Sequence, residues 1–191
     1  MKYALLFPVV AALVLVGAGS GLVRAEEKVF DNFESSTVNW ASPGWENAGG
    51  VEITISAEKA SEGKQSLKLV ARDEPQDWKN RFVVAREASL DLSNANMVMD
   101  IYTDAATGMG VQVGFDSAGD YYESEKKILS QGWNKDITFD LGAKDFKCKA
   151  SDWKNTVPLA DRSDITKFFI LITHAKKDKG VTVYVDNIRF K

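Results

Sequence analysis

Hydrophobic and polar residues alternate with a period of two along most of the chain after residue 25, and almost nothing repeats every 3.6 residues. Such alternation predicts β-strands, because neighbouring side chains on a strand point to opposite faces. Clusters of Gly, Asn, Asp and Ser interrupt the alternation and supply the turns. The expected strands are residues 29–33, 51–56, 66–71, 78–86, 96–102, 110–115, 121–129, 133–140, 167–174 and 181–190.

This series of short strands predicts an all-β fold, a two-sheet antiparallel β-sandwich of jelly-roll type. Residues 142–164 are the exception, because they show no clean alternation. The stretch is long for a structureless loop in a compact domain, so we expect it to be functional or to fold into a helical turn. No linker interrupts the chain, and we expect one domain over residues 26–191.

The alternation also assigns faces within each strand. Val111, Val113 and Phe115 are expected to fill the core, as are Met97, Met99 and Ile101 in an earlier strand. The side chains between them are expected on an exposed sheet face that is polar and partly aromatic. This outer set is Asp100, Tyr102, Gln112 and Asp116.

The first 25 residues have the layout of a secretory signal peptide. Lys2 supplies a positive start, an apolar stretch follows, and Val23 and Ala25 place small residues at positions −3 and −1. The uncharged stretch 3–23 is also long enough for an uncleaved membrane anchor. Cleavage is favoured, because the glycine-rich residues 17–21 make a weak spanning helix. We therefore expect a periplasmic or secreted protein that is free of the membrane once the leader is removed.

Charge and cysteine content narrow the function further. Without the leader, 22 basic and 27 acidic residues remain, a net charge of −5. The basic residues are not clustered as phosphate binding requires, which argues against a nucleic-acid partner.

Cys148 is the single cysteine, so no internal disulfide is expected and the core or a metal must hold the fold. We expect Cys148 itself to be an exposed or half-buried spectator.

Several short motifs occur in a fixed order along the chain. They are Val29-Phe-Asp-Asn-Phe-Glu34, Gly63-Lys-Gln-Ser-Leu67, Leu90-Asp-Leu-Ser93, Met99-Asp-Ile-Tyr102, Gly132-Trp133 before a strand, and Val183-Tyr-Val-Asp-Asn-Ile-Arg189. The set resembles the β-jelly-roll carbohydrate-binding modules, with a galactose-binding-domain-like fold, that are attached to bacterial glycanases. The resemblance covers residues 29–190 and is more specific for the fold than for the ligand.

The motifs at the two ends of the chain suggest a calcium site. If the first and last strands are neighbours, Glu34 and Asp186 come near the loop 61–64, whose carbonyl groups are free in a tight turn. Carboxylate and carbonyl oxygens are ligands that Ca²⁺ prefers. In the modules that the chain resembles, a calcium ion at this place is commonly structural. The alternative is that Glu34 and Asp186 are simple turn and cap residues, and Asp31 is a poorer third ligand.

Sugar recognition needs flat aromatic rings with short polar groups around them, because sugars present apolar C–H faces and a fringe of hydroxyl groups. Trp133 is expected in the core, whereas Trp40 and Trp45 either cap the sandwich or form a wall of the site. Trp78 and the pair Tyr121-Tyr122 each open an expected strand and, with Tyr102 and Gln112, are the candidate platform and its polar fringe. The candidate ligand-binding residues are Trp78, Asp100, Tyr102, Gln112 and Tyr122.

The resulting hypothesis is a non-catalytic protein that binds a polysaccharide or oligosaccharide by aromatic stacking on one sheet face. Two alternatives stay open. One is a periplasmic or envelope scaffold that binds a protein partner. The other is a small glycoside hydrolase that uses Glu123 and Glu125, which alternation places on one strand face. His174 is the single histidine and no G-x-S-x-G motif is present, so an enzyme is not expected.

Overall fold

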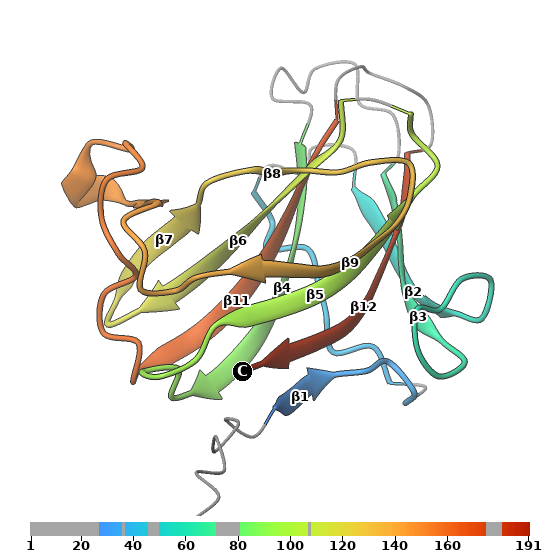
Figure 1. The fold of residues 1–191 in the computed structure, drawn as a ribbon, viewed down its shortest axis with the longest axis horizontal. Coiled ribbons are helices and arrows are strands. Elements are labelled where there is room, and N and C mark those ends of the chain that lie inside the picture. Colours follow the sequence, from blue (N-terminus) through green and yellow to red (C-terminus); the bar gives the residue numbers. More distant parts are fainter. Residues whose placement is uncertain (1–26, 36, 46–49, 72–80, 107, 175–180) are drawn as a thin grey trace, which may run out of the picture.

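The chain forms two antiparallel sheets that pack face to face, as the computed structural model of residues 27–35, 37–45, 50–71, 81–106, 108–174 and 181–191 describes (Figure 1). The first sheet has the order β2-β3-β12-β5-β9, with β1 also paired to β12. Its strands are β1 Lys28–Asp31, β2 Val51–Ser56, β3 Ser66–Ala71, β5 Met97–Thr103, β9 Gly132–Phe139 and β12 Thr182–Phe190.

The second sheet has the order β10-β7-β6-β11-β4, with β8 also paired to β6. Its strands are β4 Arg81–Leu90, β6 Gly110–Ser117, β7 Asp120–Ser124, β8 Lys127–Ile128, β10 Phe146–Lys147 and β11 Ile165–Thr173. The antiparallel β-sandwich expected from the sequence is therefore confirmed.

The core lies between the sheets and contains the alternate residues that the sequence pattern assigned to it. Met97, Met99 and Ile101 are fully buried, and so are their counterparts in β6. Phe168 of β11 is at the centre. Its ring stacks on Phe115 with centroids 5.3 Å apart. It also meets Phe30 of β1 edge-on at 5.9 Å, so this contact joins the two sheets.

The predicted strand bounds agree with the structure where Gly, Asn, Asp and Ser mark the turns in the sequence. The bounds of β2 and β3 agree end to end with the prediction, and β1 pairs with β12, so the first and last strands are neighbours as expected. The predicted strand 121–129 is instead two strands, β7 and β8. The exceptional stretch 142–164 contains β10 and one turn of 3₁₀ helix, Lys149–Ser151.

Two predictions about single residues are wrong. Cys148 is buried in the core rather than exposed, because it continues the alternation of β10, in which Phe146 is buried and Lys147 points outward. Trp133 is half-buried on the outer face of the first sheet, where it packs against Tyr102. Trp40, in contrast, does cap the core, with its ring 5.4 Å from that of Phe168.

The predicted signal peptide, residues 1–25, lies outside the described residues, and so does Trp78. Among the residues that are described, no helix is long and apolar enough to cross a lipid bilayer.

The core contacts lead to a stability prediction. Phe168→Ala should lower the free energy of unfolding by about 3–5 kcal/mol, because it removes a fully buried ring and leaves a cavity. Urea denaturation followed by tryptophan fluorescence measures this. Thr166→Ala, at an exposed position in the same strand, is the control and should change stability by less than about 0.5 kcal/mol. Equal effects of the two changes would contradict the assignment of Phe168 to the core.

Candidate functional site

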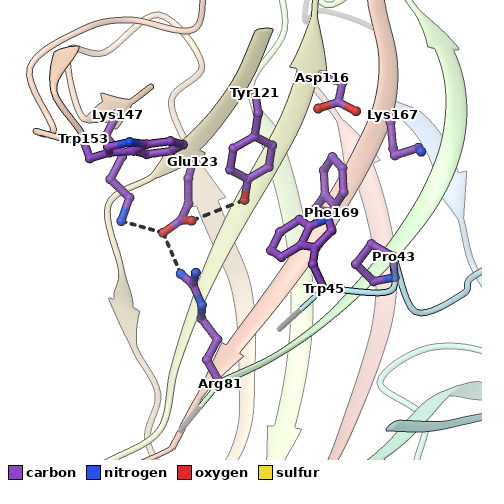
Figure 2. A pocket seen from close by; sticks show the side chains of 10 residues that line it. All are labelled: Pro43, Trp45, Arg81, Asp116, Tyr121, Glu123, Lys147, Trp153, Lys167 and Phe169. Atoms are coloured by element: carbon purple, nitrogen blue, oxygen red, sulfur yellow. Dashed lines mark hydrogen bonds and ion pairs between the residues drawn. The ribbon is translucent and has the colours of Figure 1, made fainter. Parts of the chain in front are cut away.

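A pocket of about 610 Å³ opens on the outer face of the second sheet (Figure 2). Strands β4, β6, β7, β10 and β11 form its floor, and the segments that contain Pro43 and Trp153 form its walls. Its apolar lining is Pro43, Trp45, Tyr121, Trp153 and Phe169. Its polar lining is Arg81, Asp116, Glu123, Lys147 and Lys167.

Strand register explains why these residues meet. Paired residues in antiparallel strands lie side by side on the same face. Phe169 of β11 pairs with Gly114 of β6, which pairs with Glu123 of β7, which pairs with Lys147 of β10. The neighbouring row on the same face begins with Lys167 and continues through Asp116 to Tyr121.

Gly114 makes room for an aromatic ring above the sheet. A Cβ atom at this position would lie 2.9 Å from the ring and the hydroxyl group of Tyr121. The Tyr121 ring therefore lies against the backbone of β6, a position that a larger residue at 114 would block. The floor of the pocket thus depends on a glycine in the middle of a strand, where close approach of another group is the usual reason for one.

Tyr121 lies between two exposed tryptophans. Its ring centroid is 5.7 Å from that of Trp45 and 6.3 Å from that of Trp153. The exposed fractions of these tryptophans are 38% and 54%. Phe169 is buried beneath them, with its ring edge-on to Tyr121 at 5.2 Å. Figure 2 shows the rings of Trp153 and Trp45 on opposite sides of Tyr121.

Trp153 is held by an ordered turn. The residues Asp152 and Trp153 both have positive φ, 54° and 56°, directly after the 3₁₀ helix. The Trp153 N–H donates a hydrogen bond of 3.1 Å to the Cys148 carbonyl oxygen, and Cys148 is packed in the core. The base of the turn is therefore fixed to the sandwich while the indole projects into the pocket.

The polar part of the pocket is centred on a buried carboxylate. Glu123 Oε1 accepts hydrogen bonds from Arg81 Nη1 at 2.9 Å, Lys147 Nζ at 2.7 Å and Gln112 Nε2 at 2.7 Å. Tyr121 donates to the other oxygen, Oε2, at 3.3 Å. The Glu123 side chain is only 3% exposed, and a buried charge is costly unless it is paired. Arg81 lies in β4 and Lys147 in β10, the two ends of the strand order in this sheet. The ion pairs of Glu123 therefore connect the two edges of the sheet.

Lys167, the third cation of the lining, forms a second and more exposed ion pair with Glu87. Lys167 Nζ lies 2.6 Å from Glu87 Oε1, and this hydrogen bond raises the pKa of Lys167. Burial raises the pKa of the Asp116 carboxyl group, an effect that the nearby Lys167 opposes. Asp116 therefore faces the pocket as a partly desolvated carboxyl group.

Solved structures share this architecture, although neither a family model nor a curated protein matches the sequence. The family 11 carbohydrate-binding module of the cellulase Lic26A-Cel5E of Clostridium thermocellum superposes with a TM-score of 0.59 at 16% identity, over 86% of this chain and 94% of that one. A family 28 module specific for non-crystalline cellulose superposes with a TM-score of 0.56 at 20% identity, over 97% of this chain and 99% of that one.

This chain has the fold of a carbohydrate-binding module. The resemblance of the sequence motifs to such modules is thereby confirmed for the fold. The same fold also occurs inside larger enzymes. An exo-β-agarase matches with a TM-score of 0.58 at 17% identity, and the match covers 86% of this chain but 24% of the agarase.

The module fold separates the candidate ligand residues onto two outer faces. Tyr102 lies on the first sheet, between Trp133 at 5.5 Å and Tyr184 at 5.9 Å. Asp100 is on the same sheet but is buried, and it accepts hydrogen bonds from Ser61 Oγ and the Asp136 N–H. The expectation of one shared exposed face is therefore wrong, because alternation distinguishes the two faces of a strand but does not assign the strand to a sheet.

Gln112 and Tyr122 belong to the second sheet but do not line the pocket. Gln112 is buried beneath Glu123 and donates to it, so it supports the site from below. Tyr122 points into the core, and its burial raises the pKa of its hydroxyl group. The expectation that Tyr122 is exposed is wrong by one residue, since Tyr121 has the outward position.

Local sequence signals exist for some of the missed residues. The turn between β6 and β7 consists of Ala118 and Gly119, both with positive φ, as two-residue type I′ hairpins require. Recognising it would have paired Asp116 with Tyr121 and so placed Tyr121, rather than Tyr122, on the outward face that alternation already gave to Asp116. Trp153 lies in the stretch 142–164, which was expected to be functional or to fold into a helical turn. No local signal links Arg81 to Glu123, which are 42 positions apart.

Glu34 and Asp186 both reach the loop between β2 and β3, as expected, but the loop presents N–H groups to them. Glu34 Oε1 accepts from the N–H groups of Lys64 and Gln65 at 2.8 and 2.9 Å, which lower the pKa of its carboxyl group. Asp186 Oδ2 accepts from the N–H groups of Ser61 and Glu62 at 2.7 and 3.1 Å, whereas burial raises its pKa.

This arrangement does not fit a calcium ion as it stands, because Ca²⁺ is coordinated by oxygen atoms and N–H groups repel it. The described residues also contain no cluster of three or more His, Cys, Asp and Glu side chains suited to a metal. Calcium binding by Glu34 and Asp186 stays a prediction. Thermal melts with added calcium and with a chelator test it, since an ion that binds only the folded state raises Tm. Identical melts would leave the hydrogen bonds as the explanation for both carboxylates.

The contact between Glu34 and Gly63 leads to a second prediction. Gly63 has a φ of 62°, and a Cβ atom there would clash with Glu34 Oε1. Gly63→Ala should therefore destabilise the protein more than Gly119→Ala, whose Cβ would meet nothing within 4 Å at a φ of 87°. Gly119→Ala, the control, should lower the free energy of unfolding by about 1–2 kcal/mol, because a side chain is unfavourable in the left-handed conformation.

Urea denaturation of both variants measures the difference. In a Glu34→Ala background the two glycine changes should cost the same, because the side chain that obstructs residue 63 is gone. An unchanged difference in that background would show that Glu34 is not the obstacle.

Proposed function

We propose that this protein binds a carbohydrate chain in the pocket on the outer face of the second sheet, and that it does so without catalysing a reaction. The observation that carries the proposal is the position of Tyr121 between two exposed tryptophans, beside a row of charged hydrogen-bonding groups. Exposed tryptophans in a concave site are uncommon on surfaces that have no ligand.

The chemistry of the pocket suits a sugar ring. The aromatic side chains offer apolar faces to the C–H groups of a sugar. The charged row beside them offers donors from Lys147 and acceptors from Glu123 and Asp116 to hydroxyl groups. The volume, about 610 Å³, lies within the usual range for ligand pockets.

The structural neighbours suggest which sugars to test first. One solved structure of the family 11 module from Clostridium thermocellum is a complex with a β-1,3-1,4-mixed-linked tetrasaccharide, and it superposes with a TM-score of 0.58 at 15% identity. The family 28 module is specific for non-crystalline cellulose. These precedents support β-glucans as the first ligands to test.

The two alternative functions receive less support. A flat outer face without aromatic rings would favour a scaffold that binds a protein, whereas this face is hollow and lined by aromatic rings. The hydrolase hypothesis needs Glu123 and Glu125 together. Glu125 follows the end of β7, is exposed and does not line the pocket, while Glu123 is held by Arg81 and Lys147. Glycoside hydrolysis needs two carboxyl groups that flank the sugar, and only Glu123 lines this pocket as part of that hypothesis.

Export is part of the same proposal. The signal peptide inferred from residues 1–25 would bring the binding site to the periplasm or the medium, where polysaccharides are encountered.

The proposal predicts the effects of removing the aromatic rings. Tyr121→Ala and Trp153→Ala should each weaken binding to a soluble β-glucan by about tenfold or more, since tenfold corresponds to about 1.4 kcal/mol and central aromatic anchors commonly exceed that. Isothermal titration calorimetry and affinity electrophoresis on glucans, xylans and mannans measure this. Trp133→Ala, a half-exposed tryptophan on the first sheet, is the matched control and should bind like the wild type.

Two results would contradict the proposal. One is the absence of binding to every glycan tested by the folded wild type. The other is a loss of affinity in Tyr102→Ala but not in Tyr121→Ala, which would return the binding site to the first sheet.

A further inference from the structure

We infer that Glu123 makes the pocket favour uncharged glycans, because its carboxylate offsets part of the positive charge that would otherwise attract acidic ones. The inference rests on the proposed function, since it concerns the ligand class of the same pocket. It assigns to Glu123 a role in specificity in addition to its contacts with neighbouring side chains.

The first step is the pairing of the two cations nearest the pocket floor. Arg81 and Lys147 approach the same oxygen of Glu123, at 2.9 and 2.7 Å. Their side chains are 15% and 23% exposed, and that of Glu123 is 3% exposed. At this depth charges interact more strongly than at the open surface, so the shared carboxylate offsets one of the two positive charges.

The third cation that lines the pocket is also paired. Lys167 lies 2.6 Å from Glu87, and the carboxyl group of Asp116 faces the pocket beside it. Each lysine and arginine that lines the described pocket therefore has a carboxylate neighbour. The three cations Arg81, Lys147 and Lys167 are matched in number by the carboxylates of Glu123, Asp116 and Glu87. A uronate or sulfate group entering the pocket would therefore meet no excess of positive charge, and the carboxylates of Glu123 and Asp116 would lie near it as like charges.

An uncharged glycan meets no such barrier. In the described part of the chain, Glu123 Oε1 has three donors whereas Oε2 has a single contact, the Tyr121 hydroxyl group at 3.3 Å. An ionised carboxylate has about four acceptor positions, so Oε2 is suited to accept from a sugar hydroxyl group. The same residue thus accepts hydroxyl groups and rejects anionic groups.

Glu123→Gln tests the inference directly, because it removes the negative charge that Arg81 and Lys147 share, with little change in volume. The variant should gain affinity for polygalacturonate by at least about tenfold over the wild type. The gained binding should weaken steeply as salt is raised, since it depends on charge. Affinity electrophoresis in gels that contain polygalacturonate or barley β-glucan, at low and high salt, measures both effects.

Glu125→Gln is the matched control. It makes the same chemical change two residues away, at an exposed position outside the pocket, and should bind both polysaccharides like the wild type. Circular dichroism and thermal melts establish that each variant is folded.

The inference is overturned if the wild type binds polygalacturonate as tightly as β-glucan, or if folded Glu123→Gln gains no affinity for polygalacturonate. The first comparison uses the unmodified protein and decides the matter even if the variant does not fold. A wild type that binds neither polysaccharide, together with a gain in Glu123→Gln, would contradict the proposed function while supporting the role of Glu123.

Discussion

The pocket depends on the register between β6 and β7, which the two-residue turn at Ala118 and Gly119 sets. A turn of two residues allows one pairing of the strands, and a shift by one residue would exchange their faces. With this pairing, Tyr121 and Glu123 point outward while Tyr122 points into the core. The position of Tyr121 over Gly114 follows from that pairing.

The electrostatics of the pocket couple the two edges of the second sheet. Arg81 lies in β4 and Lys147 in β10, and both depend on the carboxylate of Glu123 in β7. A buried ionic cluster of this kind contributes little net stability compared with apolar packing, but removing Glu123 takes away the carboxylate that the two cations share. The arrangement is therefore better understood as fixing the geometry of the site than as a source of stability.

The fold could be predicted from the sequence because strand formation leaves a local signal. The alternation in β6 identified its core residues correctly, and turn residues marked the ends of β2 and β3. The site could be predicted only in part. Tyr102 and Gln112 have the same outward alternation but lie on different sheets, because sheet order is decided by contacts between distant segments. The pairing of Arg81 with Glu123 is equally non-local and left no pattern to read.

The turn that carries Trp153 has a consequence for the thermodynamics of binding. Asp152 and Trp153 both have the left-handed conformation, which is unfavourable for residues other than glycine. The free energy of folding compensates for this strain, because the turn is fixed to the buried Cys148. The indole is therefore already positioned before any ligand arrives, and little conformational entropy remains to be lost on association. We therefore expect the ligand to bind with little rearrangement of the backbone.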